Sequence, residues 1–272
     1  QSVIQAQPVS CVFLSKTLNP LWKSKQPMKI LLLDIETSPN TAHVWGLWQQ
    51  NVSINQLMES SYVLCYAAKW LDDVDVLFDS VHQSKPKKML KGIHGLLNEA
   101  DAVVHYNGTK FDIPTLNKEF LLHSYNPPSP YKQIDLLRVV RSQFRFPSNK
   151  LDYVAQRLGL GQKHAHEGHS LWVKCMNGDN DAWERMQEYN IQDVVLLESL
   201  YHTLLPWIKT HPNRNLFSES AVCPTCGSHS IQKRGQAISL SGSYQRYQCR
   251  DCGSWSQGVK SLRKSVEVKH HA

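Results

Sequence analysis

Two acidic residues stand two positions apart at the end of an apolar run, where they could hold a metal ion. Asp34 and Glu36 lie in MKILLLDIETS, residues 28 to 38, whose apolar length predicts a β-strand. Alternation along a strand places both side chains on the same face. Like charges this close are costly unless a cation neutralises them, and carboxylate oxygens suit Mg²⁺ or Mn²⁺. Taken alone, such a pair is more typical of a solvated strand end.

Two further acids follow elements that could carry them to the same place. Asp112 lies in HYNGTKFDIPTL, after an apolar run and at the start of a predicted helix, where N-capping is the alternative role. Asp193 lies four residues after Tyr189 in EYNIQDVVLLESL, so one helical face presents a phenol and a carboxylate. An amphipathic helix with a buried tyrosine is the alternative there. The order of the three patterns along the chain favours one shared site.

LLLDIETS, YNGTKFDIPTL and YNIQD together resemble the three motifs of the DEDD exonuclease superfamily. Tyr189 places the third motif in the tyrosine branch, in a form similar to the proofreading domains of family-B DNA polymerases and related stand-alone nucleases. The resemblance covers roughly residues 28 to 205, including residues 134 to 163, which are similar to the polymerase segment between the second and third motifs. It implies an α/β fold of the RNase H-like type, with a mixed sheet flanked by helices.

The resemblance also implies a role for each matching residue. Asp34, Glu36 and Asp193 would bind one catalytic metal ion, and Asp34 with Asp112, directly or through water, would serve the second. Two such cations, Mg²⁺ or Mn²⁺, can activate the attacking water and stabilise the departing 3′ oxygen of a phosphoryl displacement. Tyr189 would orient that water. The family positions near the substrate terminus and along the cleft are matched by Asn107, Phe111 and Thr37.

Four cysteines form two tight pairs near the C-terminus. Cys223 and Cys226 are followed, after a gap of 22 residues, by Cys249 and Cys252, and a glycine follows each pair. This spacing predicts a tetrahedral zinc site. The intervening SIQKRGQAISLSGSYQRYQ combines β-forming residues with glycine turns, as in a zinc ribbon. Because so small a module buries little core, we expect one structural Zn²⁺ to supply much of its folding free energy.

Cations and aromatic rings alternate on the predicted ribbon, a combination that binds nucleic acid through phosphates and stacked bases. The candidates for this contact are Lys233, Arg234, Arg246 and Tyr247. The module is also similar to the zinc ribbons of some transposases and transcription factors. A purely structural ribbon, or one that docks on a replication or repair protein, is the alternative.

The chain carries 30 Lys and Arg against 23 Asp and Glu, a formal charge of +7, and the excess is unevenly placed. From Lys209 onward there are ten basic and three acidic residues, whereas residues 28 to 208 carry 17 basic and 20 acidic ones. A basic C-terminal module beside a mildly acidic segment fits phosphate-backbone binding by the ribbon. A basic tail that only favours solubility is the alternative.

Apolar periodicity predicts further elements around the motifs. Strands are expected at 62 to 70, 74 to 81 and 102 to 107, and helices at 87 to 99, from Asp112, and at 136 to 142, 151 to 158 and 182 to 205. The polar segment THPNRN, residues 210 to 215, is the best boundary between modules. The predicted division is an extension (1–27), an RNase H-like domain (28–209), a linker (210–215), a zinc ribbon (216–262) and a basic tail (263–272).

Cysteine use and hydropathy favour a cytoplasmic protein. The remaining Cys11, Cys65 and Cys175 are scattered, which argues against a disulfide framework. No stretch approaches the roughly 18 uninterrupted apolar residues of a membrane helix. The first residues lack the pattern of a secretory signal. No membrane partner is expected.

Several polar residues are left out of the predicted site. The histidines of HAHEGH, His164, His166 and His169, are more typical of an exposed polar loop than of a ligand set. Asp135 and Asp152 are more typical of helix caps or surface acids.

The expected activity is that of a stand-alone 3′-to-5′ exonuclease that hydrolyses phosphodiester bonds, with single-stranded DNA or frayed ends preferred. One alternative is a binding protein that keeps the scaffold with weak catalysis, although all four acids and Tyr189 are present. Another is an RNA-directed or structure-specific nuclease, because discrimination between DNA and RNA depends on contacts to the 2′ position.

Overall fold

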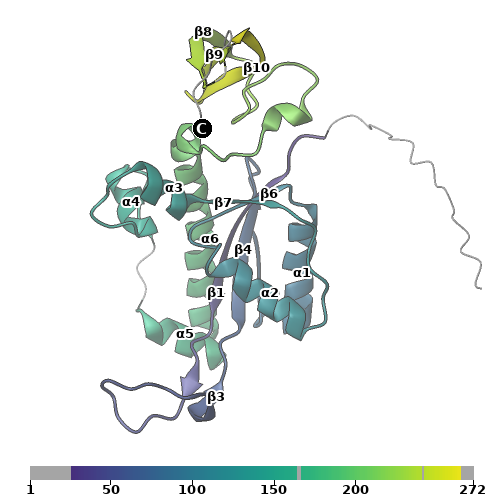
Figure 1. Ribbon diagram of the computed structural model, residues 1–272. Helices are drawn as coiled ribbons and strands as arrows, with labels where there is room; N and C mark the ends of the chain where they lie inside the picture. The colour runs from purple at the N-terminus through teal and green to yellow at the C-terminus, as the bar shows by residue number, and fades with distance from the viewer. Residues whose placement is uncertain (1–25, 164–166, 241, 265–272) are drawn as a thin grey trace, which may run out of the picture.

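The structure, a computed structural model, describes residues 26–163, 167–240 and 242–264 (Figure 1). The predicted extension up to residue 25, His164, His166 and the tail from residue 265 lie outside the described residues. The strands are β1 (Ile30–Thr37), β2 (Thr41–Ala42), β3 (Leu57–Glu59), β4 (Val63–Trp70), β5 (Leu77–Ser80), β6 (Ala102–His105), β7 (Lys132–Asp135), β8 (Ile231–Ile238), β9 (Gly242–Cys249) and β10 (Trp255–Lys264). The α-helices are α1 (Pro86–Glu99), α2 (Asp112–Leu122), α3 (Leu136–Gln143), α4 (Leu151–Arg157), α5 (His169–Met176) and α6 (Asn180–Leu204).

A five-stranded mixed sheet in the order β5-β4-β1-β6-β7 forms the centre of the larger domain. β1 pairs antiparallel with β4, and β4 pairs antiparallel with β5, which confirms the expected opening meander. On its other edge β1 pairs parallel with β6, and β6 pairs parallel with β7. Parallel neighbours need crossover connections, and α1 and α2 lie in those connections. The α/β architecture, a mixed sheet flanked by helices, is therefore confirmed.

Side chains of β1 alternate between two cores on opposite faces of the sheet. The odd-numbered residues from Leu31 to Ile35 pack with α1 and α2 on one face. Ile30 and Leu32 pack with α3, α4 and α6 on the other face. These two groups of helices lie on opposite sides of the sheet in Figure 1. Asp34 and Glu36 continue the row of Ile30 and Leu32, so the pleat directs both carboxylates toward α6.

Helix α6 is the element that brings distant residues to β1. Asp179 caps its N-terminus by accepting a hydrogen bond from the Ala182 N–H, at 2.9 Å. The helix runs for 25 residues and is followed by Pro206, which cannot continue it. Its buried face includes Tyr189 and Asp193, one turn apart. The helix predicted at 182 to 205 is therefore confirmed as α6, and its Asp193 side chain faces the sheet.

Three features of the fold were not predicted from the sequence. β7 is four residues long and half exposed, and β2 and β3 form a pair of two and three residues, so neither shows a usable alternation. α5 begins at His169, which was expected in a polar loop; its side chain is nevertheless exposed. None of the helices among the described residues is long and apolar enough to cross a membrane.

The cysteine-rich segment forms its own antiparallel sheet, in the order β10-β9-β8. It lies at the C-terminal end of α6 (Figure 1). There the Tyr201 hydroxyl and the His211 Nε2 are 2.7 Å apart. Phe217, Cys226 and Cys252 pack against the same core as Tyr201. Along the helix axis, Asp193 is about 16 Å from Leu204, given 1.5 Å per residue. The ribbon therefore sits away from the acids.

Candidate functional site

Three acidic side chains meet at the carboxyl end of β1. One oxygen each from Asp34, Glu36 and Asp193 lies within 4.8 Å of the others. Asp112 lies outside this group of three, in the first turn of α2, and its Oδ1 accepts a hydrogen bond from the Ile35 N–H at 3.2 Å. Because Ile35 stands between Asp34 and Glu36, the fourth acid lies beside the other three. The structure thus brings together the acids that the sequence proposed as one site.

Burial and mutual repulsion raise the pKa values of these acids. Burial is the largest cause for Asp34, whose pKa lies well above its ordinary value, and the charges of the other three acids raise it further. Burial, followed by the charge of Asp193, raises the pKa of Glu36 to about 8. Burial raises the pKa of Asp112 to about 7. Buried carboxylates carry their charges at neutral pH when a cation compensates them, and an oxygen-only donor set fits a hard divalent ion.

Two neutral donors hold the carboxylates in place. The Asn190 amide donates to Asp34 Oδ2 at 2.7 Å, and the Trp172 indole donates to Glu36 Oε2 at 3.2 Å. Such outer contacts orient metal ligands and tune their basicity. Sequence reasoning missed both residues. Asn190 could have been found, because it lies three residues before Asp193 and hence on a similar helical face; Trp172 gave no signal, because α5 itself was not predicted.

Lys163 is a further residue that the sequence analysis missed. Its ammonium pairs with Asp193 and donates a hydrogen bond to the Tyr189 hydroxyl at 3.1 Å. Although burial lowers the pKa of Lys163, Asp193 and Tyr189 raise it above the ordinary value, so the side chain is charged. Burial and the charge of Asp193 raise the pKa of Tyr189, so its phenol stays protonated at neutral pH. Tyr189 therefore presents a neutral hydroxyl beside the acids.

The three weaker site candidates lie near the acids in different settings. Asn107 has a φ of 70°, a left-handed conformation that asparagine tolerates, and its N–H donates to Asp135 Oδ1 at 2.9 Å. Asp135 also caps α3, as expected. Thr37 follows Glu36 and is half-buried. Phe111 precedes Asp112 at the N-cap of α2, with 43% of its surface exposed, so it is not a core residue.

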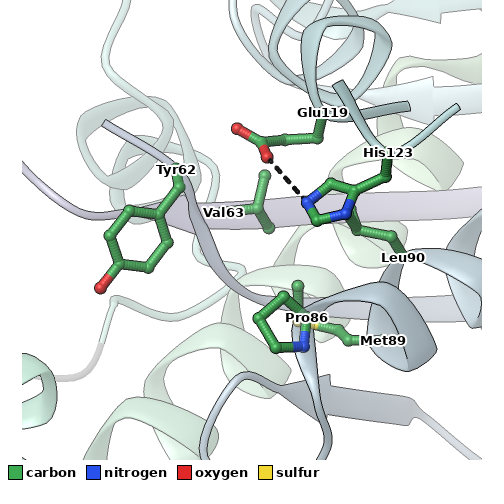
Figure 2. A pocket seen from close by; sticks show the side chains of 7 residues that line it. All are labelled: Tyr62, Val63, Pro86, Met89, Leu90, Glu119 and His123. Atoms are coloured by element: carbon green, nitrogen blue, oxygen red, sulfur yellow. Dashed lines mark ion pairs between the residues drawn. The ribbon is translucent and has the colours of Figure 1, made fainter. Parts of the chain in front are cut away.

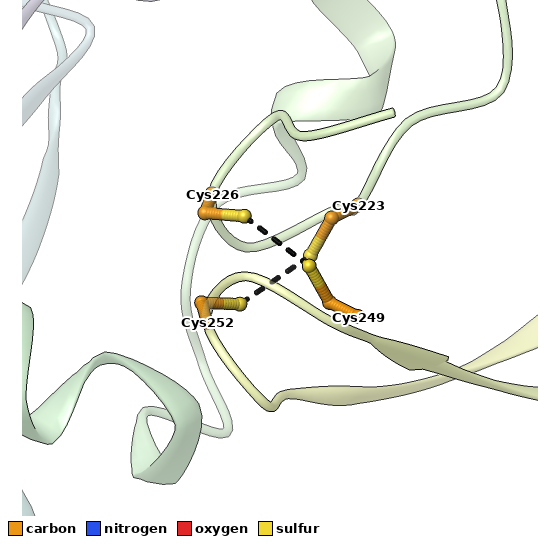
Figure 3. A group of neighbouring side chains, drawn as sticks. All are labelled: Cys223, Cys226, Cys249 and Cys252. Atoms are coloured by element: carbon orange, nitrogen blue, oxygen red, sulfur yellow. Dashed lines mark hydrogen bonds between the residues drawn. The ribbon is translucent and has the colours of Figure 1, made fainter. Parts of the chain in front are cut away.

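The four predicted zinc ligands converge at the base of the ribbon (Figure 3). The Cys223 and Cys252 sulfurs are 3.7 Å apart, and the Cys226 and Cys249 sulfurs are 3.6 Å apart. A tetrahedron with zinc–sulfur bonds of about 2.3 Å has sulfur–sulfur edges of about 3.8 Å. Hydrogen bonding with Ser254 and with backbone N–H groups outweighs burial and lowers the pKa of Cys223 to about 7, whereas burial raises the pKa values of Cys226 and Cys252. The geometry fits a tetrahedral metal ion bound by thiolates.

The predicted nucleic-acid contacts of the ribbon divide between two faces of its sheet. Lys233 and Tyr247 are cross-strand partners and therefore share one face. Arg246, next to Tyr247, points to the other face, where its guanidinium lies 5.0 Å from the ring centroid of Trp255. Arg234 accepts a hydrogen bond from Arg246 Nε at its carbonyl, at 2.9 Å. Trp255, half-exposed, was not among the predicted residues.

Two other features of the nuclease-like domain lie apart from these sites. Asp72, Glu198 and His202 form a group near the surface, in which Glu198 already pairs with Lys69 and Asp72 lies 3.4 Å from His202. Figure 2 shows a pocket of about 280 Å³ that contains none of the four acids. Its carboxylate, Glu119, is paired with Lys118 at 2.9 Å and faces His123 at 4.0 Å. These contacts account for the charges without a ligand.

Comparisons with known proteins agree with the fold. A family model described as RNase_H superfamily matches residues 31–205. A solved structure of a family B DNA polymerase, from the hyperthermophilic archaeon Pyrobaculum calidifontis, is similar, with a TM-score of 0.53 and 16% sequence identity. The match covers 82% of this chain and 33% of the polymerase chain, so this chain spans about a third of that protein's length. At this identity the likeness shows the fold alone. A search of curated proteins gave no match.

Proposed function

This chain belongs to the RNase H superfamily, and on that premise we propose that it is a stand-alone 3′-to-5′ exonuclease of the DEDD tyrosine branch. The preferred substrate is single-stranded DNA or a frayed duplex end. The observation that carries the proposal is the convergence of Asp34, Glu36 and Asp193 within 4.8 Å, with Asp112 beside them. Acids held this close, two of them half-buried and two buried, fit divalent cations better than a role in the core.

Each acid has a place in the proposed site. Asp34, Glu36 and Asp193 would hold one Mg²⁺ or Mn²⁺, and Asp34 with Asp112 would hold a second. When bound, such a pair supplies Lewis-acid chemistry for an in-line phosphoryl displacement. The Asn190 amide and the Trp172 indole fix the Asp34 and Glu36 carboxylates for this purpose. We assign no separate catalytic role to Glu36 beyond metal binding.

Tyr189 has the chemistry to orient the attacking water. Its phenol stays protonated, so the hydroxyl can donate one hydrogen bond and accept another. It already accepts one from Lys163. The hydrogen bond from Lys163 thus fixes the position of the Tyr189 hydroxyl beside the acids. Asn107, Phe111 and Thr37 would contact the terminal nucleotide.

The ribbon would hold one structural Zn²⁺ and add contacts to nucleic acid through Lys233, Arg234, Arg246 and Tyr247. Docking of a replication or repair protein on the ribbon is the alternative role. The position of the ribbon at the far end of α6 supports contacts to parts of a substrate that are remote from the cleaved bond. The proposed division of the chain keeps an RNase H-like domain at 28–209 and a zinc ribbon at 216–262.

The experiment that tests this function uses DNA and RNA strands labelled at the 5′ end, incubated with Mg²⁺, Mn²⁺ or EDTA. A ladder that shortens stepwise from the 3′ end, formed with either metal and abolished by EDTA, is expected on single-stranded DNA. Internal cuts at a structural junction would indicate a structure-specific nuclease, and preferred degradation of RNA would change the substrate class. Strand binding without cleavage under all metal conditions would leave only a binding module.

A further inference from the structure

Tyr189 and Lys163, which border the acid cluster, also line a pocket of about 700 Å³. Its other walls come from Tyr106 and Asn107 after β6, from Arg141 on α3, and from residues 149 to 152 at the start of α4. None of the four acids belongs to its lining. The pocket thus adjoins the proposed site, and of its lining residues only Asn107, Lys163 and Tyr189 have a part in the proposed function.

The charge of this pocket is opposite to that of the acid cluster. Three cations, Arg141, Lys150 and Lys163, line it together with one acid, Asp152. Both oxygens of Asp152 are already occupied: Oδ1 accepts from the Lys163 N–H at 2.9 Å and Oδ2 from the Gln156 amide at 2.7 Å. The hydrogen bond from the Lys163 backbone is the largest cause of the lowered pKa of Asp152. Asp152 therefore helps to position Lys163.

Two of the cations have side chains that remain available to a ligand. Lys163 is paired with Asp193. Within the part of the chain that the structure describes, Arg141 and Lys150 form no ion pair, and both are exposed. Cations on a mildly acidic domain, gathered in one pocket and lacking protein partners, are suited to an anionic ligand.

The frame that carries these cations is rigid. The Tyr106 hydroxyl donates to the Asn149 carbonyl at 2.6 Å and so fixes the residue before Lys150. Asp135 accepts hydrogen bonds from Asn107 and from the first turn of α3, the helix that carries Arg141. A pocket whose walls are held by such contacts is largely formed before a ligand binds.

We infer that Arg141 and Lys150 bind phosphates of a single nucleic-acid strand whose scissile bond lies at the acid cluster. This inference rests on the proposed nuclease function. The phosphate is the anion that a nuclease substrate repeats along its length, and a pocket of about 700 Å³ has room for a short stretch of one strand. The half-buried ring of Tyr106 supplies a surface for a base beside those cations.

The test measures binding of a fluorescent single-stranded oligonucleotide by anisotropy across a salt series, with Ca²⁺ in place of Mg²⁺. Arg141→Ala and Lys150→Ala should each weaken binding and reduce the slope of log K against log salt by about 0.7, the value for one phosphate contact on a single strand. The double variant should lose about twice that slope. Arg141→Lys should keep the slope, because it keeps the charge.

Matched controls come from the same helix and the opposite face of the sheet. Arg138, one turn before Arg141 on α3, lines a different pocket with Trp207 and Lys209, so Arg138→Ala should leave the slope unchanged. Lys91→Ala on α1 should do the same. Unchanged slopes for both Arg141→Ala and Lys150→Ala, or equal losses in the two controls, would overturn the inference.

A separate measurement distinguishes this inference from the proposed function. Hydrolysis of bis(4-nitrophenyl) phosphate, a diester with no neighbouring phosphate, by the wild-type protein reports the acid site alone. Cleavage of that ester together with unaltered strand binding in the double variant would reject the phosphate pocket and keep the nuclease. No cleavage of ester or strand would reject the nuclease, while the anisotropy series would still decide whether Arg141 and Lys150 bind phosphates.

Discussion

The Asn190 side chain donates a hydrogen bond from its amide to Asp34 Oδ2, at 2.7 Å, and so joins α6 to the end of β1. Asn190 is fully buried, so this contact fixes both the carboxylate and the distance between the two elements. Asp193, one turn later on α6, lies within 4.8 Å of the same carboxylate. Asn190, three residues before Asp193, thus fixes Asp34, and both acids are proposed metal ligands.

Replacing Asn190 with Ala should therefore reduce activity by about 10- to 100-fold, the usual cost of removing an outer contact to a metal ligand. The loss should be partly recovered at high Mn²⁺, because a loosely held Asp34 binds metal more weakly. Rates measured over a Mn²⁺ series test this. Glu188→Ala, on the exposed face of α6, is the matched control. Wild-type rates at low Mn²⁺ would mean that Asn190 only fills the core.

Tyr189→Phe should lower the single-turnover rate by on the order of 10²-fold or less, with little change in strand affinity. The ring packs edge-on against Trp172, with centroids 6.1 Å apart, and phenylalanine can keep that contact. Only the hydroxyl that would orient the water is lost. Comparing single-turnover rates with binding constants separates the two effects. An unchanged rate would assign Tyr189 to the core.

The sequence predicted most of the fold and the acid site for an identifiable reason. Apolar alternation in β1 and the one-turn spacing of Tyr189 and Asp193 are local patterns, and they place Asp34, Glu36 and Asp193 on the faces that meet in the structure. The resemblance in motif order then predicted that these distant segments lie side by side in one site. Lys163 lies at the end of the segment, residues 134–163, that resembles the polymerase segment between the second and third motifs. That resemblance did not indicate its ion pair with Asp193.

Contacts that depend on tertiary structure were not predictable in this way. Trp172 reaches Glu36 from α5, a helix of eight residues whose pattern is too short to recognise. The Arg246–Trp255 stack depends on the register of β9 and β10, and no spacing within one strand reveals it. The phosphate pocket combines residues from five separate segments.

Without cations at the acid cluster, the protein should lose stability as the pH rises. Burial raises the pKa of Glu36 to about 8 and that of Asp112 to about 7, above their unfolded values near 4. Between about pH 4 and pH 8 the folded state thus binds more protons than the unfolded state, so the free energy of unfolding falls with pH. Melting temperatures of the zinc-loaded protein without added Mg²⁺ or Mn²⁺, from pH 5 to 8.5, test this prediction.

Glu36→Gln should flatten that dependence, because the amide does not titrate, and Mn²⁺ should restore the melting temperature of the wild type most strongly above pH 7. A melting temperature that rises steadily over this range, without added Mg²⁺ or Mn²⁺, would contradict the assignment of raised pKa values to the acid cluster.

Removing the zinc site should affect both modules. Cys223→Ser with Cys226→Ser should release one equivalent of zinc per chain and weaken strand binding, because the basic ribbon unfolds. The melting temperature should also fall, since Cys226 and Cys252 pack against the core at the end of α6. Metal analysis, anisotropy and thermal unfolding measure the three effects. Gln257→Ala, at an exposed position of β10 outside the ligand set, is the control.

If the double variant kept wild-type affinity and salt dependence for DNA, the ribbon would be a docking module for protein. If it kept its zinc, the ligand set would be wrong. Hydrolysis at saturating strand concentration should survive, because the acids lie about 16 Å along α6 from the end against which the ribbon packs.

The most direct measurement of the central claim is single-turnover cleavage of a 5′-labelled DNA strand by the wild type, Asp34→Ala and Asp193→Ala in Mn²⁺. The wild type should shorten the strand stepwise from the 3′ end. Both variants should lose nearly all cleavage while keeping their fold and most of their strand binding, because each lacks a metal ligand. Wild-type cleavage by either Asp34→Ala or Asp193→Ala would contradict the assignment of these acids to a catalytic metal site.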